Sequence, residues 1–195
     1  MKNNSEFKNL VEQTKKREKI KKEKVDIKWI ITIIIIAFVI SFSLSFIANS
    51  TIPNLSLIFG IILTLIFIFI GILFDIVGVA VTSADEAVFH SMASRKVKGA
   101  TTAVRFKKSA DKTSSFCCDV IGDICGVISG AAGTTICAIL VTKYHTDLLL
   151  TGLIITAIIS SLTIGGKAIG KSFAINKSDI ILYEFSKFIS NFYKN

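Results

Sequence analysis

Charged side chains interrupt several long apolar stretches of this 195-residue chain. Asp75 lies inside one such stretch, and Asp119 and Asp123 lie near the start of another. A charge at the centre of a lipid-buried helix costs about 2.5–3.5 kcal/mol on insertion scales, so these residues are usually paired or functional. Asp119 and Asp123 are four residues apart and would share one face of a helix. These carboxylates are the first candidates for chemistry.

Further polar residues follow at the ends of the same stretches. Ser83 and Glu86 come after the stretch that contains Asp75, and Lys167 ends the last one. Carboxylate and hydroxyl oxygens are the ligands that hard cations such as Mg²⁺ prefer. The structural alternative is that the polar residues at the ends of these stretches only mark where the helices leave the lipid. We predict an inward-facing metal site formed by Ser83, Glu86, Asp119 and Asp123, with Lys167 as a tuning charge and Asp75 on the ion path.

Other kinds of chemistry have no support in the sequence. There is no nucleophile–base arrangement, phosphate-binding loop or HExxH motif, so we expect no enzyme activity and no cofactor. The net charge is +9, but basic residues interleaved with aromatics, or a folded basic module, are absent. We therefore expect no nucleic-acid partner.

The elements that must hold these side chains are membrane helices. The chain is 51% hydrophobic and only 19% charged, below the roughly 25% of soluble domains. Four stretches reach the length of about 20 residues that a spanning helix needs: 29–48, 55–82, 116–142 and 148–168. We predict an all-α membrane protein with four transmembrane helices.

Amphipathic surface helices are expected within 87–112 and 177–193. In the second of these, Ile181, Phe185, Phe188 and Phe192 form one apolar stripe at helical spacing.

The distribution of the 23 Lys and Arg residues predicts the orientation. Ten lie in 1–28, seven between Arg95 and Lys112, and five from Lys167 onward, which leaves only Lys143 for the outer side. This positive-inside pattern predicts a multi-pass protein of the cell membrane with both termini cytoplasmic. The basic tail 1–28 could bind anionic lipid or only set the topology. The helix at 29–48 is expected to be a retained anchor rather than a cleaved signal.

Glycines recur at a spacing of four in the third stretch, at Gly122, Gly126 and Gly130. Small residues at this spacing let helix backbones approach closely. We expect tight packing on this face, within one chain or in a homodimer.

Several segments, in order, resemble the transmembrane domain of the CNNM/CorC (CorB-like) magnesium transporter family. The segment at 83–91, SADEAVFHS, resembles the family motif S-x-S-E-T-A-x-x-S, and Gly99, Ala100 and Ala103 resemble its G-x-x-x-A segment. IGD at 121–123 falls where the family has I-G-N-N. GKAIGKSFA at 166–174 resembles the motif G-E-x-x-P-K-x-x-A. The resemblance covers about residues 60–190.

The resemblance implies a three-helix domain at 55–195 that dimerises and moves Mg²⁺ outward, in exchange for Na⁺. Ser83 and Glu86 would match polar residues of the first motif, and Asp123 an asparagine of the second. The sequence also departs from the family. The helix at 29–48 is extra, and no CBS pair follows the domain, so we expect a stand-alone unit. Ile124 and Gly170 replace the second asparagine and the proline.

Lys167 replaces the glutamate of the last motif. Its ammonium could occupy the place of a bound cation, paired with Asp123 or Glu86, or it could extend to the cytoplasm alone. Two functions therefore stay open. One is divalent-cation transport, and the other is a membrane scaffold or regulatory subunit that has kept the fold but lost the ion site.

Overall fold

A computed structural model of the chain describes residues 27–51 and 56–192. These residues are helical almost throughout, with no strand among them, and the all-α class is confirmed. Four candidate spans are long and apolar enough to cross a membrane. The helices are α2 (Ile27–Thr51), α3 (Leu57–Ser83), α4 (Glu86–Ser94), α5 (Ala100–Lys108), α6 (Ala110–Ser115), the π-helix η2 (Phe116–Gly122), α7 (Asp123–Tyr144), α8 (Leu148–Asn176) and α9 (Ser178–Phe192).

The chain divides into two units, residues 1–35 and 36–195, and α2 runs through the division. The surface of α2 is rich in exposed apolar side chains such as Ile34, Phe38 and Phe46. The hydroxyls of Thr32 and Ser43 donate to carbonyls one turn earlier, so these polar groups are satisfied within the helix. An apolar helix of this kind is suited to lipid. The basic tail and its predicted lipid contact fall largely on residues 1–26, outside the described residues.

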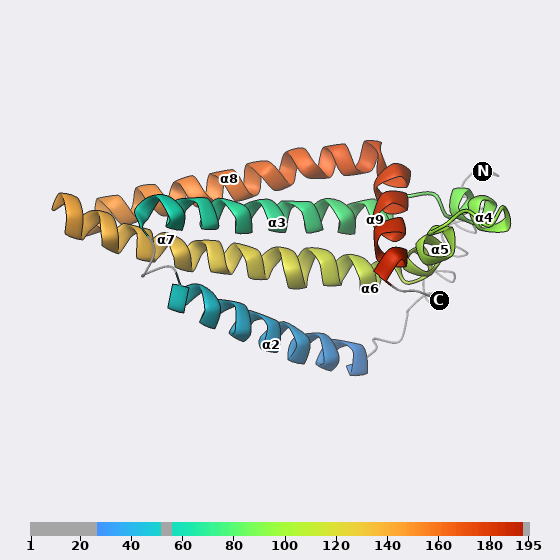
Figure 1. The fold of residues 1–195 in the computed structure, drawn as a ribbon, viewed down its shortest axis with the longest axis horizontal. Coiled ribbons are helices and arrows are strands. Elements are labelled where there is room, and N and C mark those ends of the chain that lie inside the picture. The colour runs from blue at the N-terminus through green and yellow to red at the C-terminus, as the bar shows by residue number, and fades with distance from the viewer. Residues whose placement is uncertain (1–26, 52–55, 193–195) are drawn as a thin grey trace, which may run out of the picture. The chain divides into compact units, whose positions relative to one another are not determined.

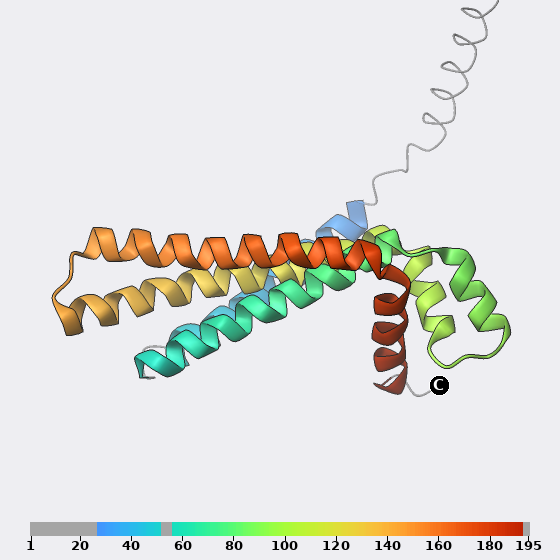
Figure 2. The same ribbon diagram turned by 90° about the horizontal axis from the view of Figure 1, so that it is seen from above.

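Three long helices of the second unit, α3, α7 and α8, lie side by side (Figures 1 and 2). Glycines allow the close approach. A Cβ atom on Gly71 would lie 3.1 Å from Cys125 Cβ, and one on Gly170 would lie 2.7 Å from Ile76 Cγ1. Close packing of this kind drives helix association in lipid, where apolar burial alone gives no preference.

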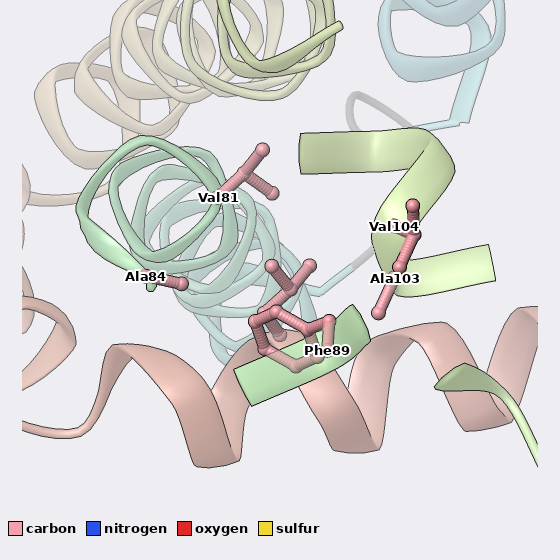
Figure 3. Packing of buried hydrophobic residues seen from close by; sticks show 6 residues of the cluster. Val81, Ala84, Phe89, Ala103 and Val104 are labelled. Carbon is pink, nitrogen blue, oxygen red and sulfur yellow. The ribbon is translucent and has the colours of Figure 1, made fainter. Parts of the chain in front are cut away.

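Short helices cover one end of this bundle. In both views α9 runs across the long axis of the bundle, directly after α8 (Figures 1 and 2). A buried apolar cluster joins the end of α3 to α4, α5 and α9, and Figure 3 shows how its side chains pack together. Its members are Val81, Ala84, Phe89, Ala103, Val104 and Leu182. We call this end of the bundle the basic end, because α5 lies there with Arg105, Lys107 and Lys108 in its last turn.

The helices extend beyond the apolar stretches that predicted them. The third span is continuous from Ala110 to Tyr144, against 116–142 expected, and α8 continues to Asn176, against 168. Hydropathy detects only the part suited to lipid, whereas backbone hydrogen bonding continues the helix through polar residues.

The apolar stripe of α9, which suits either a lipid surface or a partner subunit, is not the face that packs inside the chain. Leu182 and Ser186 are fully buried, while Phe188 is 61% exposed. The reason is close packing against α5: a Cβ atom on Gly99 would lie 2.8 Å from Lys187 Cα. A small side chain such as Ser186 suits this approach better than phenylalanine.

Candidate functional site

Four charged side chains form a cluster where the three long helices α3, α7 and α8 meet. Lys167 Nζ of α8 lies 3.2 Å from Asp123 Oδ1 of α7 and 3.7 Å from Asp75 Oδ1 of α3. Lys171 Nζ, one turn further along α8, lies 3.6 Å from Asp75 Oδ2. Asp75 is only 3% exposed. Lys167 thus bridges the carboxylates of Asp75 and Asp123, and Lys171 forms a second ion pair with the more buried of the two, Asp75.

The sequence of α3 places Asp75 in the interior. Thr64, Ile68, Gly71, Asp75 and Gly78 are all buried, and their alternating spacing of four and three residues makes one helix face. This face packs against α7 and α8. A carboxylate on it cannot reach water without disrupting the contact, so it needs a cation from a neighbouring helix.

Lys167 reaches both carboxylates because a glycine leaves room for its ammonium. A Cβ atom on Gly122 would lie 3.5 Å from Lys167 Nζ and 3.6 Å from the carbonyl oxygen of Gly71. Any larger side chain at Gly122 would extend into this space. Lys171 follows at i+4, on the same face of α8 as Lys167.

A π-helix leads into the cluster. In η2 the backbone is widened over Phe116–Gly122, immediately before Asp123. Cys118 of η2 donates its thiol to the backbone carbonyl of Asp75, at 3.6 Å. Helices rarely adopt this form, and where they do it is frequently at functional sites. The widened turn thus contacts both α3 and the charged cluster.

The three bridged groups lie at one level of the bundle. Asp75 is 18 residues from the start of α3, Lys167 is 19 from the start of α8, and Asp123 is 21 from the end of α7. At 1.5 Å per residue these separations are about 27–32 Å. If the far ends of these helices lie at one edge of a hydrocarbon core about 30 Å thick, the cluster lies at the other edge, on the basic end.

The cluster balances two carboxylates with two ammonium groups. In a low-dielectric site, attraction to a lysine ammonium offsets part of the desolvation cost of burying a carboxylate. Asp75 Oδ2 is buried and accepts no hydrogen bond from the described residues, although Lys171 is within ion-pair distance. Asp123 is open by contrast, with 67% of its side chain exposed. The arrangement is an ion-paired cluster in which carboxylates from two helices contact one ammonium group.

The residues predicted from the sequence fall in different places. Asp123 and Lys167 form one of the two predicted pairs, whereas Glu86 contacts His90 Nε2 at 3.1 Å, within α4. Ser83 ends α3 and is exposed, and Asp119 is an exposed residue of η2. Within 27–51 and 56–192, no three or more His, Cys, Asp or Glu residues are grouped to hold a metal ion.

The sequence reasoning missed Lys171, and it placed Asp75 beside the site rather than at its centre. The spacing of Lys171 from Lys167 was a usable signal, since residues at i and i+4 face the same neighbour.

No match to this chain was found among family models, curated proteins or solved structures.

Proposed function

We propose that this chain is a membrane transport domain for a divalent cation, similar to the CNNM/CorC domain, with Mg²⁺ as the favoured ion. The observation that carries the proposal is the convergence of Asp75 and Asp123, from two helices, on the single ammonium of Lys167. Two carboxylates that face one cation at the edge of the hydrocarbon core supply the oxygen ligands that Mg²⁺ prefers.

Lys167 acts in this proposal as a tethered cation. Its flexible four-carbon stem can withdraw the ammonium from between the carboxylates, and Asp123 is exposed enough to receive an ion from water. An incoming Mg²⁺ then takes the position of the ammonium on Asp75 and Asp123. Ser83 and Glu86, which the resemblance implies, and Asp119, which the sequence places on the same helix face as Asp123, remain candidate oxygen ligands of the ion.

The basic end faces the cytoplasm in this proposal, which places both termini on that side. The support is the positive-inside pattern, since residues 84–115 and 177–192, which form the short helices of this end and the segments beside them, carry nine of the 13 Lys and Arg residues that follow the first span. The site then opens inward, and an outward movement of Mg²⁺ would be coupled to Na⁺ entry.

The test is Mg²⁺ flux in liposomes that hold the purified chain. We expect the wild-type chain to carry flux and Asp75→Asn/Asp123→Asn to abolish it, because the amides remove both charges from the site. Asp111→Asn is the matched control, since this exposed aspartate lies on α6, outside the cluster, and its removal should leave flux intact. A folded wild-type chain without flux would refute the transport proposal.

Lys167→Glu is a separate prediction for the same site. The change replaces the tethered cation by a third carboxylate, so we expect Mg²⁺ to bind about tenfold tighter or more. Isothermal titration of the detergent-solubilised protein measures the affinity. An affinity equal to that of the wild-type chain would show that Lys167 does not compete with the ion.

A scaffold or regulatory subunit is the second candidate function. One observation favours it: Lys171 adds a second ammonium, so both carboxylates already have partners without a bound ion. A scaffold should lose stability in the Asp75→Asn/Asp123→Asn variant but show no flux in any form of the chain.

We also propose a homodimer through the groove between α7 and α8. A shallow groove of about 180 Å³ is lined by Gly126 and Gly130 of α7 and by Thr156, Ser160 and Thr163 of α8. A Cβ atom on Gly126 or on Gly130 would meet nothing within 4 Å. These two glycines therefore serve no close contact within the chain, and a helix of a second copy could pack against them.

Gly126→Leu/Gly130→Leu tests the dimer. The leucines would fill the groove without disturbing the chain's own packing, so we expect a dimer at least about tenfold weaker, by light scattering in detergent. Gly165→Leu is the control, because its position is equally open but outside the groove. A dimer of unchanged strength in the double variant would exclude this interface.

A further inference from the structure

A cavity lies between α5 and the last turns of α9, away from the ion-paired cluster. Its volume is about 790 Å³, in the range of small-molecule sites. One part of its wall carries charge and hydroxyl groups, from Lys98, Thr101, Thr102 and Arg105. Another part is apolar, from Phe106 and Ile189. The cavity is thus amphipathic.

The charge of this cavity has no counterpart among the residues that the structure describes. None of the described lining residues is acidic, and within 27–51 and 56–192 the side chains of Lys98 and Arg105 take part in no ion pair. Lys107 of the same helix is different, since it donates to the carbonyls of Val81 and Thr82 at the end of α3. Two cations without a partner on one cavity wall favour an anionic ligand.

The walls are held in place by direct contact between α5 and α9. The backbone at Gly99 approaches Lys187 so closely that a Cβ atom would lie 2.8 Å from its Cα. The rings of Phe106 and Phe185 pack with their centroids 5.8 Å apart. The cavity is therefore preformed, and a ligand need not order it.

The position of α9 indicates where the ligand comes from. Helix α9 begins two residues after the end of α8 and crosses the bundle axis in both views (Figures 1 and 2). A helix at right angles to the end of a spanning helix lies at headgroup depth. Ile180 and Phe188 of α9 are exposed apolar side chains, 62% and 61% open, as a lipid-surface helix requires.

We propose that this cavity binds the headgroup of an anionic phospholipid. The phosphate accepts hydrogen bonds from Lys98, Arg105 and the threonine hydroxyls, while the glycerol and the start of an acyl chain lie against Phe106 and Ile189. The inference needs only that α8 spans the membrane and is independent of the transported ion. It assigns the contact to α5 and α9, whereas the sequence pointed to the N-terminal tail.

Binding of dioctanoyl phosphatidylglycerol to the full chain in detergent tests the proposal. We expect saturable binding, and Lys98→Gln/Arg105→Gln should weaken it about thirtyfold, the effect of two basic groups near an anionic headgroup. Arg95→Gln/Lys108→Gln is the matched control: it removes the same charge from neighbouring exposed positions that do not line the cavity. The control should stay within about threefold of wild type.

Three results would overturn the proposal. Equal weakening in the two double variants would mean attraction by net charge rather than by a site. Equal binding of dioctanoyl phosphatidylcholine would remove the need for anionic lipid. Full displacement of the lipid by an equal concentration of inorganic phosphate would mean a site for the free anion. Arg105→Lys alone keeps the charge and should retain most of the binding, which separates loss of the ligand contact from misfolding.

Discussion

Replacing Lys167 by methionine should lower the free energy of unfolding by about 3 kcal/mol, although the new side chain has a similar length and is apolar. The reason is Asp75, which is 3% exposed and would lose the ammonium that lies 3.7 Å from its Oδ1. Breaking a buried ion pair from one side costs about 3–5 kcal/mol, because the remaining charge has no compensation. Lys171 keeps part of that compensation, so we expect the lower end of the range. Denaturation in detergent measures the loss.

Two companion variants make this prediction specific to the charge. Lys171→Met should cost much less, since this lysine is 52% exposed and water replaces its contacts. Asp75→Leu/Lys167→Met should recover most of the stability, because both members of the pair are then apolar. If Lys167→Met and Lys171→Met destabilise equally, Lys167 is not the principal partner of Asp75.

The Lys167→Met variant also connects the stability of the chain with ion binding. With the ammonium of Lys167 absent, Asp75 keeps only Lys171 as a partner and Asp123 loses its contact with Lys167, so a bound Mg²⁺ would relieve the imbalance of charge. A ligand that binds only the folded state adds stability in proportion to the logarithm of its concentration over its dissociation constant. Recovery of Lys167→Met by Mg²⁺, but not of the double variant, would support a cation site in place of a purely structural ion pair.

The membrane helices could be predicted from the sequence because lipid restricts the choice of structure. An apolar stretch of about 20 residues must satisfy its own backbone hydrogen bonds, and a helix does so without any neighbour. The all-α fold follows from this local argument. Helix ends were less certain, since polar residues at 110–115 and 169–176 continue the helices past the apolar stretches.

The ion-paired cluster could be predicted only in part. The sequence shows that Asp75, Asp123 and Lys167 lie in spans and that such charges need partners. It does not show how far each helix is rotated, and this rotation decides which pairs meet. The rotation follows from close backbone contacts at glycines such as Gly71 and Gly122, whose neighbours lie on other helices. The contact of Glu86 with His90 could have been predicted from the sequence, since the two residues are one helical turn apart.

The buried face of α9 illustrates a different difficulty. Apolar periodicity marks a stripe through Phe188 that is suited to lipid or to a partner subunit, but it does not reveal the face that packs inside the chain, where Ser186 is buried. Periodicity weighs hydropathy and not size, but a helix held between a bundle and α5 needs small residues where backbones meet. The relevant signal was a glycine far away in the sequence, Gly99, which no pattern within α9 could reveal.

Gly99→Ala should destabilise the basic end by about 3 kcal/mol, although it adds only one methyl group. Gly99 has φ of 86°, which an L side chain adopts at a cost of about 1 kcal/mol or more. The new Cβ would also lie 2.8 Å from Lys187 Cα, so α5 and α9 must separate, and overpacking of this kind costs about 1–3 kcal/mol. Hydrogen exchange of α5 and α9 measures the effect locally, and thermal unfolding measures it for the whole chain.

Gly165→Ala is the matched control, because a Cβ atom at this helical position of α8 meets nothing within 4 Å. Alanine is the better helix former, so we expect no loss of stability there.

Since α5 and α9 form the walls of the proposed lipid cavity, Gly99→Ala should weaken phosphatidylglycerol binding while Lys167 keeps its contact with Asp123. Loss of exchange protection confined to α5 and α9 would show that the contact at Gly99 holds the cavity together. Unchanged protection in the variant would mean that the two helices tolerate a wider separation and that the cavity is formed by other contacts.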